Sequence, residues 1–467
     1  MSPTTSSGPG PRVVVVGGGP GGYEAALVAA RDGARVTLVE DVAPGGSAVL
    51  TDAVPSKTLI ATAEWMTIAE RATELGIRGE GGGPVVDLGR VNARVLELAR
   101  AQSQDIGDRL AEAGVEVIAG RGRLAAPDEV VVTAADGERT LAADVVLLAV
   151  GARPRVLPEA VPDGERILAW TQLYGLTELP RRLVVVGSGV TGAEFAGAYN
   201  ALGAGVVLVS SRDRVLPGED PDAAAVIEEV FRTRGMEVLA RSRAAGVERT
   251  ADGVAVHLTD GRVVEGSHAL MAVGSVPATG GLGLEAAGVA LGEGGQVIVD
   301  RVSRTSARGV YAAGDCTGVH PLASVAATQG RIAMAHALGG AVVPLDLGTV
   351  AATIFTAPEI ATVGASEASL TAEGVRFRSS RLDLGRNARA KMLGIREGFV
   401  KLFAHEASGT VLGAVVVAPR AGELIFPLSI AVQERLTVDD VAGVLTVYPS
   451  LSGSIGEVAR RLHRARD

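Results

Sequence analysis

The chain has 467 residues, of which 47% are hydrophobic, and its formal net charge at pH 7 is -9. This length suits roughly three domains of ~150 residues each. The negative charge argues against a general binder of nucleic acid or anionic membranes. The sole cysteine, Cys316, excludes an internal disulfide and a cysteine-built metal site.

Targeting and metal-binding signals are also missing from the sequence. No stretch approaches the ~18 uncharged apolar residues of a membrane-spanning helix. Residues 1–11 form a Ser-, Pro- and Gly-rich arm without the basic and apolar segments of a secretory signal. The six histidines are scattered without metal-ligand spacing. We therefore expect a cytoplasmic enzyme with no bound metal.

A first dinucleotide-binding unit opens the chain. The pattern predicts a strand, a glycine turn, a helix and a second strand over residues 12–16, 17–22, 21–31 and 35–40. The turn has the form G-x-G-x-x-G and contains Gly17, Gly19, Pro20 and Gly22. Its glycines let the backbone approach a pyrophosphate at the helix N-terminus. Glu40 ends the second strand, where its carboxylate is expected to accept hydrogen bonds from ribose hydroxyls.

A second unit of the same design follows. An apolar strand over residues 183–186 leads into another G-x-G-x-x-G turn, made of Gly187, Gly189, Val190, Thr191 and Gly192. The next strand is read within residues 205–214, with Ser210 at the position where relatives carry the acid that ends this strand. Two such units predict two bound dinucleotides.

Further motifs follow in order, and together they carry a family resemblance. They occupy residues 45–57, 144–154, 271–277, 309–315, 322–330, 357–364, 387–391, 398–402 and 447–452. With the two glycine turns, they resemble the flavoprotein disulfide reductases, such as lipoamide dehydrogenase and glutathione reductase, over nearly the whole chain.

The resemblance implies an α/β fold of two Rossmann-like domains and a C-terminal α+β dimerisation domain. The FAD-binding domain would comprise residues 1–157 and 278–346, the NAD(P)-binding domain 158–277, and the dimerisation domain 347–467. Beyond the first turn and Glu40, the residues implied to bind FAD are Gly46, Lys57, Gly151, Asp315 and Ala323. Beyond the second turn, those implied to bind NAD(P) are Glu194, Ser210, Ser211, Arg212 and Gly274. The N-terminus of the helix predicted over residues 322–330 would point at the flavin pyrimidine.

The chain departs from the family at its redox centre. Alanine stands at positions 48 and 53, where the family has its two redox cysteines. Tyr448 replaces the family's acid/base histidine, and Gly453 replaces the glutamate that orients this histidine. Cys316 lies in the flavin motif, where a buried structural role is expected. These departures predict a protein that does not reduce disulfides.

Lys57 and Glu194 are retained. In the family this lysine lies beside flavin N5 and pairs with the glutamate, and a cation there would favour hydride acceptance. A lysine in a first helical turn opposes the helix dipole, so helix propensity does not explain it. We expect Lys57, Glu194 and Tyr448, the last contributed by a second subunit, to be catalytic.

The residue at the end of the second unit's second strand indicates whether the protein prefers NADH or NADPH. NAD-preferring relatives carry an acid there, whereas this chain has Ser210, with Arg212 and Arg214 nearby. We expect NADPH to bind, with NADH also accepted. The alternative is that both arginines are solvated loop charges, and Asp213 between them weakens the NADPH prediction.

These features predict an FAD-dependent NAD(P)H dehydrogenase that reduces a small-molecule quinone by two-electron transfer, acting as a homodimer. The chain most resembles the cysteine-deficient quinone reductases of the lipoamide dehydrogenase group. Two alternatives stay open: a soluble pyridine-nucleotide transhydrogenase, and a catalytically idle flavoprotein that serves as a binding partner.

Overall fold

A computed structural model describes residues 10–77 and 83–463 of the chain. Most of the N-terminal arm, which the sequence predicts not to be a secretory signal, lies outside the described residues. The chain divides into two compact units. Unit 1 comprises residues 1–58, 92–155 and 275–345, and unit 2 comprises residues 59–91, 156–274 and 346–467. Across the described ranges, no helix is long and apolar enough to cross a membrane.

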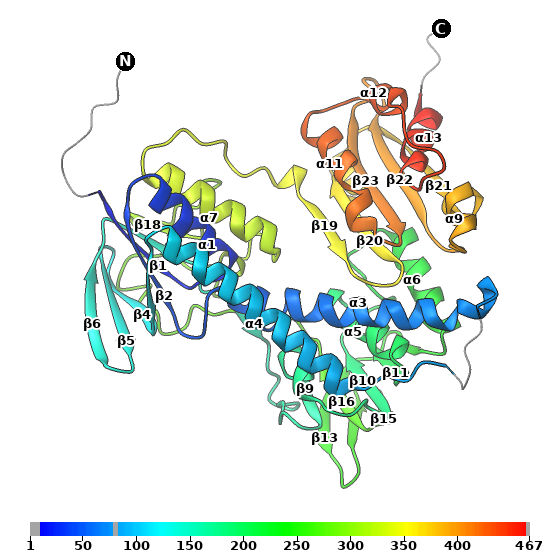
Figure 1. Ribbon diagram of the computed structural model, residues 1–467, viewed down its shortest axis with the longest axis horizontal. Coiled ribbons are helices and arrows are strands. Elements are labelled where there is room, and N and C mark those ends of the chain that lie inside the picture. Colours follow the sequence, from blue (N-terminus) through cyan, green and yellow to red (C-terminus); the bar gives the residue numbers. More distant parts are fainter. Residues whose placement is uncertain (1–9, 78–82, 464–467) are drawn as a thin grey trace. The chain divides into compact units, whose positions relative to one another are not determined.

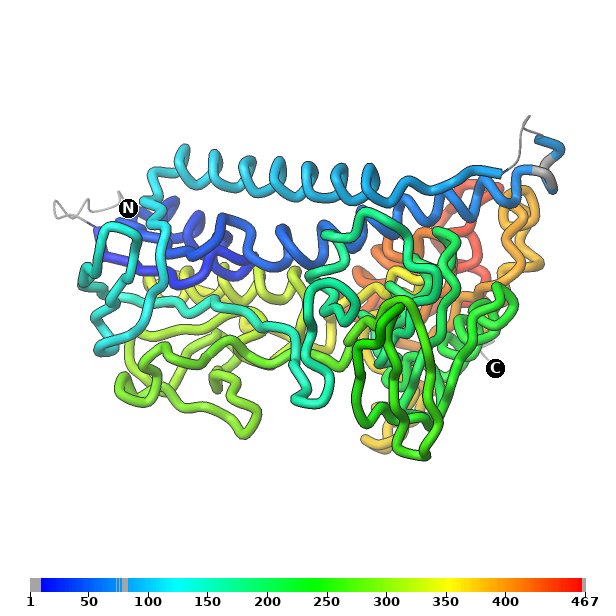
Figure 2. Tube along the Cα trace, turned by 90° about the horizontal axis from the view of Figure 1, so that it is seen from below, coloured from blue at the N-terminus to red at the C-terminus, as the bar shows by residue number. Residues whose placement is uncertain are grey.

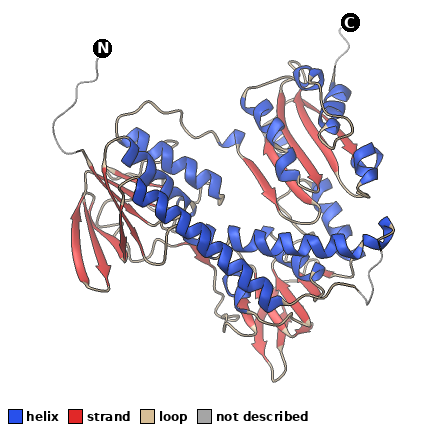
Figure 3. Ribbon diagram, viewed as in Figure 1, coloured by secondary structure: helices blue, strands red, loops and turns tan. Residues whose placement is uncertain are grey.

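Unit 1 is built on a five-stranded parallel sheet of order β18-β7-β1-β2-β3 (Figures 1 and 3). Its strands are β1 (Arg12–Val16), β2 (Arg35–Glu40), β3 (Glu116–Ala119), β7 (Val145–Leu148) and β18 (Val310–Ala312). All four residues of β7 are buried, as expected for a parallel strand that is covered on both faces.

The two faces of this sheet are covered by different layers. Val13 and Val15 share a hydrophobic core with α1 (Pro20–Arg31), α7 (Ala323–Ala337) and the C-terminal part of α4 (Leu88–Glu112). Helices α1 and α7 come from opposite ends of the unit's sequence and pack side by side (Figures 1 and 2). Val14 and Val16 face the antiparallel sheet of β4 (Arg121–Ala126), β5 (Glu129–Ala134) and β6 (Gly137–Ala142). The period-two alternation of a strand thus builds two cores from one valine run.

Unit 2 contains a second parallel sheet, of order β12-β11-β10-β16-β9. Its strands are β9 (Ile167–Ala169), β10 (Arg182–Val186), β11 (Gly205–Val209), β12 (Glu237–Leu239) and β16 (His268–Met271). Helix α5 (Val190–Ala201) follows β10, and α6 (Pro221–Thr233) follows β11. An antiparallel sheet packs into the core with β10 and β11, and consists of β13 (Ala244–Arg249), β14 (Val254–Leu258) and β15 (Val263–Gly266).

The C-terminal part of unit 2 is an antiparallel sheet of order β19-β20-β23-β22-β21 with helices packed on it. The strands are β19 (Ala351–Ile354), β20 (Glu359–Gly364), β21 (Phe377–Asp383), β22 (Phe399–His405) and β23 (Val411–Ala418). The helices are α8 (Glu367–Ala372), α9 (Ala388–Met392), α10 (Ala421–Leu424), α11 (Phe426–Gln433), α12 (Val438–Gly443) and α13 (Gly453–Leu462).

A short two-stranded ribbon lies where the chain leaves unit 1 after residue 155 and returns to it at residue 275. Strand β8 (Ala152–Pro154) pairs antiparallel with β17 (Ser275–Pro277). Both belong to unit 1, and the second parallel sheet lies between them in sequence. This ribbon explains how β18, late in the chain, joins a sheet that begins at residue 12.

The predicted fold class is confirmed: two parallel α/β sheets are followed by an α+β C-terminal region. Strands β1 and β2 have the predicted bounds. Helix α1 begins one residue earlier than predicted, at Pro20, because proline suits the first helical position. The predicted domain boundaries at residues 157, 277 and 346 stay predictions.

Candidate active site

The first glycine turn is shaped by close backbone packing. Gly17 has a φ of +101°, and a Cβ there would overlap Ala149 O, while a Cβ at Gly22 would overlap Gly17 O. A Cβ at Gly19, by contrast, would meet nothing within 4 Å. Protein packing therefore requires Gly17 and Gly22, whereas Gly19 borders open space, as a turn that receives a ligand should.

The helix ends that face the expected cofactors lack side-chain caps. No side chain caps the first turn of α1, α5 or α7. Helices α6, α8, α9 and α12 are each capped by a side-chain oxygen, whereas α2, α10, α11 and α13 also lack such a cap. A phosphate or an anionic ring would find backbone N–H groups and a positive dipole at such an uncapped end.

Glu40 lies directly over the first turn. Its Oε2 accepts a hydrogen bond from Gly18 N at 2.5 Å, and its Oε1 accepts one from Val42 N at 3.0 Å. The side chain is 9% exposed, and burial raises the pKa of its carboxyl against the lowering effect of these two bonds. The carboxylate is held rigidly where the sequence places the ribose contact.

The remaining predicted FAD residues of unit 1 gather near this turn or at its neighbouring helix ends. Gly46 begins α2 (Gly46–Leu50) with a φ of +57°, and a Cβ there would lie 2.7 Å from Gly19 Cα. Asp315 begins the short helix after β18, and burial, followed by the charge of Asp52, raises its pKa. Ala323 begins α7, and Gly151, with a φ of +66°, borders open space. Their contacts with the pyrophosphate, ribose and ring of a flavin dinucleotide stay predictions.

Lys57 is half-buried in α3 (Ala53–Glu70). It is the fifth residue of this helix rather than part of its first turn, so the expected conflict with the helix dipole is smaller than predicted. Ala48 lies in α2, and Ala53 begins α3. Cys316 is fully buried with Sγ 3.3 Å from Ala313 O, and burial raises its pKa to about 11. It is therefore an unreactive thiol.

The second glycine turn repeats the first. Gly187 has a φ of +116°, and a Cβ at Gly192 would overlap Gly187 O. Cβ atoms at Gly189 and Gly274 would meet nothing within 4 Å. Val190 and Thr191 begin α5, where Val190 is 41% exposed.

Glu194 is buried within α5. It is 3% exposed, and its Oε1 accepts a hydrogen bond from Phe355 N at 2.8 Å. This contact orients the carboxylate. The pairing of Glu194 with Lys57 stays a prediction.

The loop after β11 holds the residues expected to read the ribose 2′ position. Ser210 is fully buried, with its Oγ 2.6 Å from Ser188 Oγ and 3.1 Å from Arg212 N. Ser211 and Arg212 are exposed. The Nε of Arg214 is buried and has no hydrogen-bond partner among the described residues. Sequence reasoning did not single out Ser188, which occupies a variable position of the turn motif.

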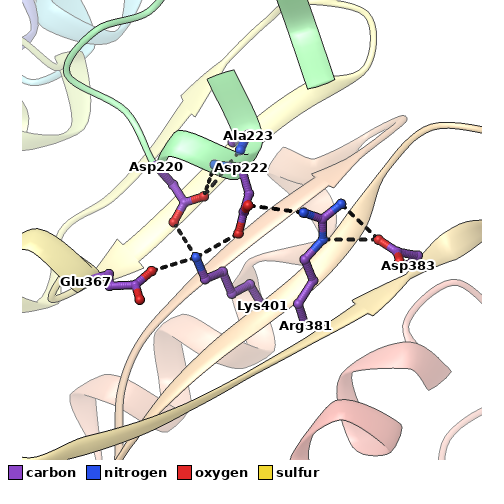
Figure 4. Close-up of polar contacts among 7 residues, drawn as sticks. All are labelled: Asp220, Asp222, Ala223, Glu367, Arg381, Asp383 and Lys401. Atoms are coloured by element: carbon purple, nitrogen blue, oxygen red, sulfur yellow. Dashed lines mark hydrogen bonds and ion pairs between the residues drawn. The ribbon is translucent and has the colours of Figure 1, made fainter. Parts of the chain in front are cut away.

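Figure 4 shows an ion cluster that the sequence did not reveal. The ammonium of Lys401, in β22, lies 2.7–3.0 Å from carboxylate oxygens of Asp220, Asp222 and Glu367. Asp220 also caps α6, by accepting from Asp222 N at 2.9 Å and Ala223 N at 3.2 Å. The cluster thereby joins the C-terminal sheet to the helix that follows the Ser210 loop.

Tyr448 lies in the segment between α12 and α13 and is 87% exposed. Several large apolar residues are also exposed on this segment and on helices α3 and α11: Trp65, Ile68, Phe426, Ile430, Val444, Leu445 and Val447. Such exposure is typical of a surface that another protein covers.

Comparison with known proteins agrees with this geometry. Residues 11–330 match the pyridine nucleotide-disulphide oxidoreductase family, and residues 350–459 match its dimerisation domain. An NAD(P)H dehydrogenase (quinone) from Mycobacterium tuberculosis is 56% identical over 461 residues, which cover 97% of this chain and 94% of that protein. A dihydrolipoyl dehydrogenase from Chlorobaculum parvum is 34% identical, with 96% of each chain covered.

Solved structures show the same fold. The crystal structure of LpdA from Mycobacterium tuberculosis superposes with a TM-score of 0.93 at 56% identity, covering 97% of this chain and 100% of that one. The flavoprotein disulfide reductase RclA from Escherichia coli superposes with a TM-score of 0.86 at 24% identity. The chain therefore belongs to the pyridine nucleotide-disulphide oxidoreductase family, with the family's dimerisation domain at its C-terminus.

Proposed function

We propose that the protein is an FAD-dependent NAD(P)H dehydrogenase that reduces quinones by two-electron transfer and does not reduce disulfides. The observation that carries the proposal is two complete nucleotide turns combined with alanine at positions 48 and 53 and a single, inert cysteine. The name of the Mycobacterium tuberculosis relative, NAD(P)H dehydrogenase (quinone), supports a quinone as the acceptor. Cytoplasmic location stays a prediction from the sequence.

Unit 1 would hold FAD through its glycine turn, Glu40, Asp315 and the N-terminus of α7. When bound, FAD would supply hydride acceptance from the nicotinamide and two-electron donation to the quinone. Lys57 would place a cation beside the ring, and Glu194 would orient that cation. With no thiol at positions 48 and 53, the small alanines would leave an apolar surface on which a quinone ring stacks.

NADPH is the proposed preferred donor, with NADH also accepted. Support comes from the absence of a carboxylate at position 210 and from Arg212 and Arg214 in the following loop.

A homodimer is the proposed assembly. The match of residues 350–459 to a dimerisation domain supports it, and so do the exposed apolar residues around Leu445, which is 99% exposed. In such a dimer, Tyr448 of each subunit would close the quinone site of the other.

The test is a two-step spectroscopic assay of the FAD-loaded protein. NADPH should bleach the flavin absorbance, and a panel of quinones should restore it with turnover. Lipoamide and glutathione disulfide should give no turnover. Hydride transfer to an NAD+ analogue that outpaces every quinone would replace the proposal with a transhydrogenase, and flavin that NADPH does not bleach would indicate an idle flavoprotein.

A further inference from the structure

The two nucleotide turns can be compared position by position within this one chain. β1 pairs with β2 so that Val16 lies opposite Val39, and β10 pairs with β11 so that Val186 lies opposite Val209. Gly17 N donates to Val39 O at 2.8 Å, and Gly187 N donates to Val209 O at 2.9 Å. Position 18 therefore corresponds to position 188, and position 40 corresponds to position 210.

In unit 1, the acid at the strand end lies against the glycine at position 18 of the turn. A Cβ at position 18 would lie 2.9 Å from Glu40 Oε2 and 3.3 Å from Glu40 Cγ. The carboxylate also receives the 2.5 Å hydrogen bond from Gly18 N. A side chain at position 18 and a carboxylate at position 40 thus compete for the same space.

In unit 2, both corresponding positions carry serine. Ser188 is 5% exposed and Ser210 is 0% exposed, and their Oγ atoms lie 2.6 Å apart. The single hydroxyl hydrogen of Ser210 can be donated to Arg212 O, at 3.2 Å, or to Arg214 O, at 3.3 Å, and Ser210 Oγ accepts a hydrogen bond from Arg212 N at 3.1 Å. The hydroxyl pair fills the space of the carboxylate and ties down the loop that carries both arginines.

We propose that Ser188 is a specificity-determining positioning residue that acts together with Ser210. Ser188 excludes a carboxylate from the strand end, and the Ser188–Ser210 pair shapes the arginine loop for a 2′-phosphate. Because Ser210 is inaccessible to solvent, it acts through this loop rather than by touching the nucleotide. This inference rests on the proposed NADPH preference and deepens it.

The proposal predicts that the two positions are coupled. In Ser210→Glu alone, the new carboxylate would crowd the side chain of Ser188. Glu40 in unit 1 would crowd a side chain at position 18 in the same way. This single variant should lose thermal stability and bind both nucleotides more weakly. Ser188→Gly/Ser210→Glu should regain the stability and prefer NADH, because the new carboxylate can then accept a hydrogen bond from the residue 188 N–H and from the ribose 2′-hydroxyl.

The experiment compares the wild type, both single variants and the double variant as FAD-loaded proteins. Thermal unfolding and the binding of 2′,5′-ADP and 5′-AMP are measured by calorimetry, beside kcat/KM for NADPH and NADH. We expect the double variant to shift the 2′,5′-ADP to 5′-AMP affinity ratio by ~10-fold towards 5′-AMP, equivalent to ~1.4 kcal/mol, since the added negative charge repels the 2′-phosphate. A purely structural role for Ser188 would weaken both ligands equally and leave this ratio unchanged.

Two results would overturn the proposal. One is a Ser210→Glu variant that is as stable as the wild type and shifts the 2′,5′-ADP to 5′-AMP affinity ratio, with no further shift when Ser188→Gly is added. The other is a double variant no more stable than Ser210→Glu. A wild type that binds 2′,5′-ADP no better than 5′-AMP would instead overturn the NADPH preference of the proposed function, while the stability measurements would still decide the coupling. The reciprocal control is Gly18→Ser in unit 1, which should lower FAD retention because its side chain meets Glu40.

Discussion

Lysine is rare in this chain: only Lys57, Lys391 and Lys401 occur among 44 basic residues. Lys57 lies half-buried in α3, and Lys401 lies at the centre of an ion cluster, whereas Lys391 is exposed in α9. Lysine presents a compact point charge, and arginine presents a planar fork. We therefore expect substitution of Lys57 or Lys401 to have specific effects, and the same substitution at the exposed Lys391 serves as the control.

Lys57→Met should slow flavin reduction by NADPH and leave FAD bound. The flavin is expected to be held mainly by the glycine turn, Glu40 and Asp315, whereas Lys57 acts on its ring. Loss of one charge-assisted contact at the hydride acceptor should cost about 1–3 kcal/mol, or about tenfold or more in rate. Stopped-flow absorbance measures this rate. Flavin reduction as fast as in Lys391→Met would indicate that Lys57 is an ordinary solvated side chain without a role at the flavin.

Ala48→Cys/Ala53→Cys should not create a disulfide reductase. The two cysteines would restore the thiol pair, but Tyr448 and Gly453 would still leave the site without the family's acid/base histidine and its partner. Tyrosine, with an ordinary pKa of ~10, is a poor base at neutral pH. Lipoamide and glutathione disulfide assays with NADPH measure the outcome. Efficient turnover by this double variant would mean that Tyr448 can replace the histidine.

At the scale of elements, the Lys401 cluster fastens α6 to β22 and α8. Burial lowers the pKa of Lys401, but the hydrogen bonds that its ammonium donates to Glu367, Asp222 and Asp220 outweigh this effect and leave the pKa above its usual value. The hydrogen bond from Lys401 lowers the pKa of Asp222. The side chain of Lys401 is 8% exposed, whereas Asp222 and Glu367 are about 40% exposed and are partly screened by water.

Lys401→Met should destabilise the protein by about 2–4 kcal/mol, because three carboxylates lose the cation that they share and, among the described residues, only Asp222 keeps a second one, Arg381, at 3.2 Å. Lys391→Met, an equal change at an exposed site, should leave the melting temperature nearly unchanged. Thermal unfolding measures both. Equal melting temperatures for the two variants would contradict a stabilising role for the cluster.

The pH dependence of the stabilisation by the Lys401 cluster follows from the pKa shifts of Asp222 and Lys401. Asp222 has a lowered pKa when folded, so its stabilising contribution is present above its ordinary pKa and is lost as pH falls through the lowered value. Lys401 has a raised pKa, so its contribution is complete at neutral pH and is lost only in strong alkali. The difference in melting temperature between wild type and Lys401→Met should therefore stay nearly constant from pH 7 down to the ordinary pKa of Asp222, 3.8, and shrink as pH falls below it. A difference that grows on acidification would contradict this assignment.

At the scale of the whole molecule, the C-terminal region exposes apolar residues that are expected to form the dimer interface. Leu445 and Val447 are 99% and 77% exposed, next to Tyr448. Leu445→Glu/Val447→Glu should convert a dimer into monomers and lower quinone turnover, because charges would be buried at the interface. Light scattering after size-exclusion chromatography measures the mass. Val343→Glu, at an 84% exposed site outside the dimerisation domain, is the control and should stay dimeric.

The sequence by itself determined the two nucleotide turns and the loss of dithiol chemistry. A strand, a glycine turn and a helix are contiguous in the chain, so their apolar runs and glycine spacing predict them directly. A single cysteine excludes a disulfide by counting alone. The first and second strands of unit 1 consequently match the predicted bounds.

Tertiary structure decided the features that depend on distant partners and burial. Ser188 and Ser210 are 22 positions apart, and Lys401 and Asp220 are 181 apart, yet each pair is in hydrogen-bond contact. The sequence predicts that Ser210 lies at the nucleotide, whereas its complete burial and its contact with Ser188 are visible only in the tertiary structure. No local pattern records such pairings, because a side chain's partner and its solvent exposure are set by how strands and helices pack, which periodicity along one segment does not encode.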